Sequence, residues 1–305
     1  MGSFFVTIWS SVISFWNLIF FHPILNILVG LYKVSGGNFG IAVILLTIIL
    51  RLLLWPLLKA QIQSAKNMAK IQPRIKEIQK KYKNDVLKLR EEQMKIFKEE
   101  GVNPAGSCLS VVVQFPFLIG VYEAIIIMSH NGATYINKLM YFPFLHYPSN
   151  YHYNLSFFVI NVGKAAADFS ISNIQIVPYI ILALLVGYSQ YLSTKVSLPI
   201  TENKIEEEIT SLEIRDAKGA KGKDAKKSAL SMDPSDMGNI MTKQMLYIMP
   251  VFTAIISLGI LGNIPSALSL YWMVQAFFIF FQSKIMTMGQ KKMLDSNNKA
   301  VSKLK

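Results

Sequence analysis

One arginine stands inside an apolar run and is the residue of this chain best placed for chemistry in a membrane. Arg51 lies within FGIAVILLTIILRLLLWPLL, residues 39–58, in which 14 of the 20 residues are Leu, Ile, Val or Phe. A guanidinium stays charged at any accessible pH, so it needs water, a counter-charge or carbonyl oxygens. Thr47 precedes it by one helical turn on the same face. Two interpretations stay open: Arg51 snorkels to the nearer interface, or it lies in a water-filled recess enclosed by protein.

Polar side chains also interrupt the other apolar runs of the chain. They are Gln114, Gln190, Ser269, Trp272 and Gln275, the last three at i, i+3 and i+6. Each by itself is typical of a helix–helix hydrogen bond, but together they favour a polar recess. We expect no carboxylate at the depth of Arg51, because Glu123 falls near the other end of its run. The pattern therefore predicts an arginine that is free to bind an acidic or polar guest.

The chain lacks the patterns of the common enzyme classes. Its four histidines match no metal spacing, and it has no HExxH, GxSxG, P-loop or dinucleotide-binding motif. Its single cysteine, Cys108, excludes an internal disulfide. We predict that the protein is not an enzyme and holds no cofactor and no metal.

The elements that must position these residues are membrane-spanning helices. The chain is 52% hydrophobic and 16% charged, against roughly a quarter charged in soluble proteins. A spanning helix needs about 20 mostly apolar residues. Suitable runs occupy residues 39–58, 108–128, 174–195 and 245–283, the last holding two runs separated by residues 262–264. We therefore predict an all-α polytopic membrane protein with a five-helix transmembrane core.

A further apolar stretch, Phe4–Phe21, lies in the N-terminal residues 1–38 and could span, act as a signal peptide or lie in the membrane interface. No Lys or Arg precedes it, which counts against a signal peptide. Trp9, Trp16 and several serines interrupt it, and His22-Pro23 is expected to end it. We predict an N-terminal interfacial helix on the extracytoplasmic side, continued by residues 24–33.

The positive charges predict the orientation of the spans. Residues 59–106, 195–244 and 284–305 hold 12, 9 and 6 Lys plus Arg, which together make 27 of the 31 in the chain. The positive-inside rule places these segments and the C-terminus in the cytoplasm, and residues 129–173 outside. The net charge of +13 is thus explained mainly by the basic residues of the cytoplasmic segments. Specific DNA binding is not expected, whereas anionic lipids fit the basic tail, residues 284–305.

The first cytoplasmic segment, residues 59–107, is expected to form a helical hairpin. Ile71, Ile75, Ile78 and Tyr82 make one apolar stripe, and Val86, Leu89 and Ile96 make another. A turn is expected near residue 84, a helix end at Gly101, and a bend or new helix start near Pro73. The hairpin is either a solvated connection or, because it greatly exceeds the usual connection of about 2–8 residues, a docking or gating element. The second segment, residues 196–244, is expected to be partly disordered.

Several motifs resemble the YidC/Oxa-type membrane protein insertases. They are NFGIAVILLTIILR followed by WPL, KAQIQSAKNM, IQPRIKEIQKKY, VNPAGSCLSVVVQFPFLIGVY, GYSQYLSTK, MLYIMP and IPSALSLYW. The resemblance implies five helices around a hydrophilic groove that opens to the cytoplasm and to lipid. By the same resemblance, Arg51, Thr47, Gln190 and Trp272 correspond to groove residues of the family. The polar residues Gln114 and Ser269 are further candidates for the groove.

The resemblance implies an insertase of the bacterial plasma membrane whose substrates are nascent membrane proteins. The ribosome and a Sec-type translocon are further candidate partners. Two other functions stay open. The chain could be an anion-selective transporter or channel component in which Arg51 binds a small carboxylate or phosphate. It could also be an assembly factor that packs helices without any groove.

Overall fold

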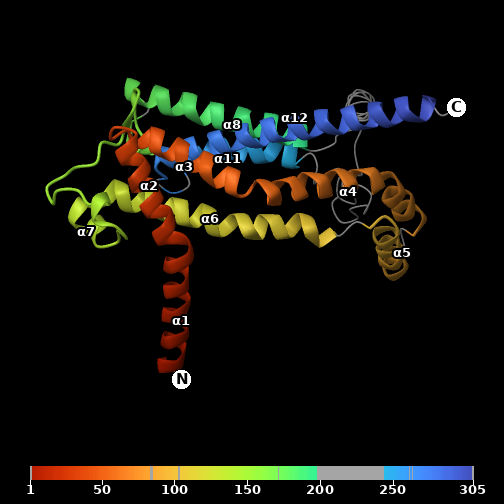
Figure 1. The fold of residues 1–305 in the computed structure, drawn as a ribbon, viewed down its shortest axis with the longest axis horizontal. Helices are drawn as coiled ribbons and strands as arrows, with labels where there is room; N and C mark the ends of the chain where they lie inside the picture. The colour runs from red at the N-terminus through yellow and green to blue at the C-terminus, as the bar shows by residue number, and fades with distance from the viewer. Residues whose placement is uncertain are drawn as a thin grey trace, which may run out of the picture. The chain divides into compact units, whose positions relative to one another are not determined.

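The computed structural model describes residues 2–82, 85–101, 104–170, 172–197, 244–260, 262 and 264–303. These residues are almost wholly helical, as Figure 1 shows, and the sheet among them has two strands. The prediction of an all-α chain is therefore confirmed. The chain divides into two compact units, which we describe separately. The first is Met1–Pro56, Leu109–Gln190 and Pro250–Ile279, and the second is Leu57–Cys108, Tyr191–Met249 and Phe280–Lys305.

The first unit contains most of the apolar helices, three of which continue into the second unit. Its helices are α1 (Gly2–Trp16), α2 (His22–Val34), α3 (Phe39–Leu53), α6 (Pro104–His130), α7 (Ala133–Asn137), α8 (Val177–Ser197), α11 (Met249–Ser257) and α12 (Ser266–Lys303). Short 3-10 turns occupy Pro143–Leu145, Ala166–Asp168 and Ile174–Ile176, and a π-helical turn occupies Asn17–Phe21. The helices that continue are α6, α8 and α12.

Helix α3 begins at a capped end and buries one face. The side chain of Asn38 accepts a hydrogen bond from the backbone N–H of Ile41 at 3.0 Å, which satisfies one free donor of the first turn. The buried residues recur at helical spacing: Phe39, Ala42, Val43, Leu46, Thr47, Leu50 and Arg51. The opposite face exposes Ile49, Leu52 and Leu53. Arg51 therefore belongs to the inward face of its helix.

The segment 39–58 that was expected to be one helix is divided at Leu54. Helix α3 ends at Leu53, and α4 (Trp55–Lys81) begins one residue later. Pro56 is the second residue of α4, where its missing N–H has no intrahelical partner to lose. The same property makes Pro56 unfavourable inside a continuous helix, which accounts for the division.

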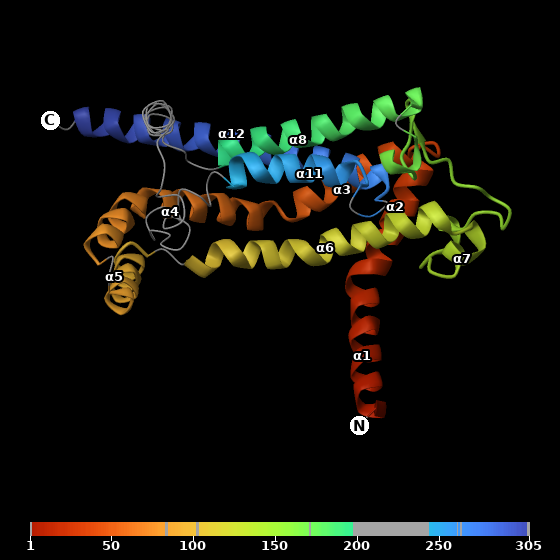
Figure 2. The same cartoon turned by 180° about the vertical axis from the view of Figure 1, so that it is seen from behind.

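The N-terminal helices form one nearly continuous rod that does not end at His22-Pro23. Pro23 lies in the first turn of α2, again a position where proline is tolerated. The indole N–H of Trp16 donates to the carboxylate of Glu123 at 2.8 Å, which attaches the rod to α6. Figures 1 and 2 show α1 running across the direction of α6. Its last two turns expose apolar side chains such as Trp9 and Phe15.

Residues 129–170 fold over the ends of α2 and α12 rather than forming a plain loop. The side chain of Asn26 donates to the carbonyls of His22 and Leu139 and accepts from the N–H of Tyr141. The hydroxyl of Tyr32 accepts from the N–H of Asn154 at 2.7 Å. A small antiparallel ladder joins β1 (Ser156–Phe157) to β2 (Ile160–Asn161), an element that the sequence had not predicted.

The connection between α11 and α12 is longer than the expected turn at residues 262–264. It runs from Leu258 to Pro265 and uses positive φ angles at Gly259 (74°) and Gly262 (128°). The backbone N–H and the hydroxyl of Ser266 both donate to the carbonyl of Lys164, at 2.9 and 2.7 Å. The first turn of α12 is thus satisfied by the 129–173 segment, which ties distant parts of the chain together.

The second unit contains a pair of helices packed through their apolar stripes. Ile71 and Ile75 of α4 and Ile96 of α5 (Val86–Glu99) form a buried cluster. Arg74 is paired with Glu99 and Glu100 at 3.0 and 2.6 Å, so α4 and α5 run antiparallel. Helix α4 continues through Pro73 without a new start, whereas Gly101, with φ of 61°, follows the end of α5 as expected. Val86 is exposed and lies outside this contact.

A π-helical turn, Gln244–Ile248, precedes α11. In the second unit, the end of α8 contacts α12 through the hydroxyls of Ser197 and Ser283, which lie 2.9 Å apart. Residues 198–243, expected to be partly disordered, lie outside the described residues. By length and composition, two described stretches could cross a membrane, Trp9–Val34 and Ile174–Ser197, and shorter apolar helices occupy Phe39–Leu53, Gln114–His130 and Leu246–Ser257.

Candidate functional site

The side chain of Arg51, on α3 of the first unit, is buried. The residue is 2% exposed, and neither Nη1 nor Nη2 has a hydrogen-bond partner in the part of the chain that the structure describes. Snorkelling would require an exposed guanidinium, so that interpretation does not fit this geometry. A buried charge without acceptors is unfavourable by several kcal/mol in order of magnitude. The site therefore retains an unused capacity to donate hydrogen bonds.

Tyr271 of α12 is a buried polar residue that interacts electrostatically with Arg51. It is 2% exposed, and its hydroxyl lies close enough to interact electrostatically with the guanidinium. Gln114 of α6 donates to the same hydroxyl at 3.4 Å, a long hydrogen bond. Three helices of the first unit, α3, α6 and α12, thus contribute one polar side chain each to this cluster.

One aromatic contact joins the start of α4 to α12. The rings of Trp55, one turn after Arg51, and Phe278 meet edge to face with centroids 5.7 Å apart. Tyr271, Gln275 and Phe278 follow one another at i, i+4 and i+7 and so share one face of α12. The Oε1 atom of Gln275 is buried and has no hydrogen-bond partner among the described residues.

The other predicted site residues are distributed unequally. Thr47 is fully buried on the inward face of α3, where its hydroxyl donates to the carbonyl of Val43 at 2.7 Å. Gln190 is half-buried on α8. Trp272 packs, partly buried, against the main apolar cluster.

Ser269 is not brought together with Arg51. Its hydroxyl donates to the carbonyl of Ser257 on α11 at 3.3 Å. Tyr271 lies two positions after Ser269, which corresponds to about 200° around the helix. Of these three predicted positions, Gln275 shares a helix face with Tyr271. That Ser269, Trp272 and Gln275 all contribute to a polar recess stays a prediction. Tyr271, which sequence reasoning missed, could have been found from the i, i+4, i+7 series through Gln275.

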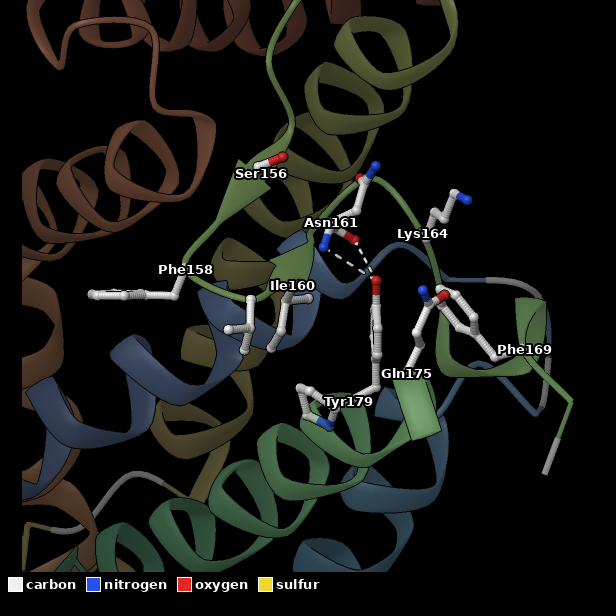
Figure 3. A pocket seen from close by; sticks show the side chains of 10 residues that line it. Ser156, Phe158, Ile160, Asn161, Lys164, Phe169, Gln175 and Tyr179 are labelled. Carbon is white, nitrogen blue, oxygen red and sulfur yellow. Dashed lines mark hydrogen bonds between the residues drawn. The ribbon is translucent and has the colours of Figure 1, made fainter. Parts of the chain in front are cut away.

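The segment 129–173 and the start of α8 enclose a pocket that the sequence did not predict. Its volume is ≈ 400 Å³, and Figure 3 shows Lys164, Phe169, Gln175 and Tyr179 around it. The hydroxyl of Tyr179 donates to the carbonyl of Asn161 at 3.1 Å. The predicted site residues do not line this pocket. The described residues also contain no group of three or more His, Cys, Asp or Glu that could hold a metal ion.

Long apolar helices and a buried arginine that has no hydrogen-bond acceptor among the described residues are typical of a helical integral membrane protein. A sequence profile of the family described as "60Kd inner membrane protein" matches residues 30–293. The chain therefore belongs to this family, the YidC/Oxa-type membrane protein insertases.

Individual relatives agree with this assignment over most of the chain. The membrane protein insertase YidC of Oceanobacillus iheyensis is 28% identical over 272 residues, 88% of this chain and 82% of the relative. The membrane protein insertase MisCA of Bacillus subtilis is 26% identical over 273 residues, 88% of this chain and 78% of the relative. A shorter match, 38% over 111 residues, covers 36% of this chain and 20% of the membrane protein insertase YidC of Nitratidesulfovibrio vulgaris.

Proposed function

We propose that this protein inserts nascent membrane proteins into the bacterial plasma membrane through a polar groove built around Arg51. The observation that carries the proposal is the enclosed guanidinium without a hydrogen-bond acceptor among the described residues. Membership of an insertase family supports it.

The physical basis is that client and groove compensate each other's desolvation. Transfer of an acidic or polar client residue into hydrocarbon has a large desolvation free energy, and the burial of Arg51 in the empty protein is also unfavourable. Charge-assisted hydrogen bonds between the two lower both penalties. The apolar part of the client can then partition into the surrounding lipid.

The proposed topology follows the positive charges. In it, α3 with the start of α4, α6, α8, α11 and α12 form five spans, and the C-terminus is cytoplasmic. The α4–α5 pair would receive the client first. Helix α1 would lie along the outer interface, which is consistent with its direction across α6. Thr47, Gln190, Trp272 and Gln114 are our proposed groove residues beside Arg51.

The proposed partners follow from the same charges. Nascent membrane proteins are the clients, and anionic lipids are attracted by the basic end of α12. The ribosome and a Sec-type translocon are candidates on the basis of charge and family alone. No catalysis is part of the proposal, because insertion is driven by partitioning of the apolar client segment.

An anion-selective transporter is the second function that a specific observation favours. An unpaired guanidinium would bind a small carboxylate or phosphate through the same hydrogen bonds that it offers to a client. This alternative predicts ion flux without any polypeptide substrate.

Vesicles that contain only this protein separate the two functions. A small single-span client with an acidic tail is synthesised beside them, and tail translocation is measured by protease protection. We expect protection with the parent and its loss with Arg51→Leu, while a loaded small anion stays inside. Anion release without client protection would contradict the insertase and support the transporter. Ile49→Leu, on the exposed face of α3, is the control variant.

A further inference from the structure

We propose that Gln275 binds the client together with Arg51, so that the site selects amide groups as well as carboxylates. The inference rests on the proposed insertase function and adds to it a second ligand class. Amide groups here mean the backbone peptide of a client or the side chains of its Asn and Gln residues.

One electrostatic interaction and one ring contact place Gln275 near Arg51. Arg51 interacts with Tyr271, and Trp55, one turn further along, contacts Phe278. Gln275 lies between Tyr271 and Phe278 on the same face of α12, one turn from each. It therefore lies between the two positions of α12 that are near Arg51 and Trp55.

The hydrogen-bonding groups of Arg51 and Gln275 that have no partner among the described residues are complementary to an amide. Arg51 offers donors at Nη1 and Nη2, and Gln275 offers a buried acceptor at Oε1, with no partner for any of them among the described residues. A carboxylate can satisfy the donors only. An amide supplies a carbonyl to Arg51 and an N–H to Gln275, so it satisfies both kinds of group.

The same groups argue against a purely structural role for Gln275. Buried polar side chains that hold a fold are hydrogen-bonded, because an unmet buried group is destabilising. Gln275 contributes an unmet acceptor to the empty protein instead. Replacing it by leucine, which has a similar size, should remove that penalty without opening a cavity.

The first test compares three clients that differ only in two residues of the translocated tail: two Glu, two Gln or two Leu. Insertion into vesicles containing only the full-length protein is measured by protease protection. We expect Gln275→Leu to slow insertion of the Gln client by about fivefold, the value of one hydrogen bond. The Glu and Leu clients should change by less than about twofold. Gln175→Leu makes the same chemical change at an exposed residue away from Arg51 and should change none.

A second variant places a competing group at the same position. Gln275→Glu brings a carboxylate near Arg51, so it should pair with the guanidinium and slow the Glu client by at least about tenfold. Unchanged insertion of the Glu client would contradict the proposed proximity.

Thermal unfolding of the empty protein makes the inference independent of insertion. We expect Gln275→Leu to leave the melting temperature unchanged or to raise it. A lowered melting temperature, or an equal loss for all three clients, would overturn the inference and make Gln275 a packing residue. If the parent inserts none of the clients, the proposed function fails. The melting temperature of Gln275→Leu then still shows whether Oε1 of Gln275 lacks a hydrogen-bond partner in the empty protein.

Discussion

Two buried polar side chains of the first unit differ in how their hydrogen-bonding groups are used. Asn26 is 6% exposed, and its amide makes bonds to His22, Leu139 and Tyr141. Arg51 is 2% exposed, and its terminal nitrogens make none to the described residues. A buried group whose bonds are all made holds segments together, whereas one with unmet bonds weakens the empty fold and retains binding capacity. Asn26 therefore has a structural role, and Arg51 is better explained by a ligand.

The largest expected effect is an opposite response of these two positions to leucine. Asn26→Leu leaves the carbonyl of Leu139 and the N–H of Tyr141 without their partner, so the free energy of unfolding should fall by about 2–3 kcal/mol. Arg51→Leu removes a buried charge and should leave that free energy unchanged or raise it. Denaturant unfolding of the protein in detergent measures both. A comparable loss for Arg51→Leu would show that the arginine is bonded in the resting protein.

Alkaline pH should destabilise the segment 129–173 through the phenol of Tyr147. Burial raises the pKa of the Tyr147 phenol from 10.0 to about 12, with a further contribution from the neighbouring Tyr151. Because the folded value lies above the unfolded one, the stabilisation is complete below pH 10 and is lost as pH rises towards 12. Stability should fall across this window, less steeply in Tyr147→Phe. An identical slope in that variant would exclude Tyr147 as the titrating group.

A smaller effect is expected when Arg51 loses its polar neighbour. Tyr271→Phe removes the hydroxyl that accepts the 3.4 Å bond from Gln114. Because that bond is long, stability should change by less than about 1 kcal/mol, and insertion of an acidic client by less than about fivefold. The protease-protection assay measures the second quantity. Complete loss of insertion would shift the client contact from Arg51 to Tyr271.

The smallest effect is expected at an arginine whose partners are present and exposed. Arg74 pairs with Glu99 and Glu100 at the surface, where water and salt screen the charges. Arg74→Ala should lower the melting temperature slightly, by less as salt is added, and should leave insertion of an acidic client intact. Lys95→Ala, which breaks another exposed pair with Glu92, is the control. A loss of insertion as large as that of Arg51→Leu would place client selection on the α4–α5 pair.

The inward position of Arg51 could be predicted because helical periodicity is a local property. The apolar residues of 39–53 recur every three or four positions, and Thr47 and Arg51 fall on the same side as the buried ones. The end of α3 was less predictable, since the apolar run continues through Pro56 to Leu58 and conceals the division at Leu54. The stripe of Ile71, Ile75 and Ile96 follows the same local rule.

The partners of a helix face depend on packing between distant segments and were harder to predict. In the sequence, Ser269 and Gln275 are both polar interruptions of one apolar helix. In the structure, the hydroxyl of Ser269 donates to α11, whereas Gln275 shares a helix face with Tyr271. Strands of two residues, such as β1 and β2, are too short to leave a periodic signal. The network around Asn26 joins residues 113 and 115 positions apart, a pairing that no local pattern specifies.

The most direct test of the account is a disulfide between the client tail and the inward face of α3. Single cysteines are placed at Thr47, which is fully buried, or at Ile49, which is 40% exposed on the opposite face, in a Cys108→Ser background. The client carries one cysteine beside its acidic residue, and insertion is stopped part-way. We predict a cross-link to position 47 and none to position 49. Equal cross-linking at both positions, or none at 47 while insertion proceeds, would contradict passage of the client beside Arg51.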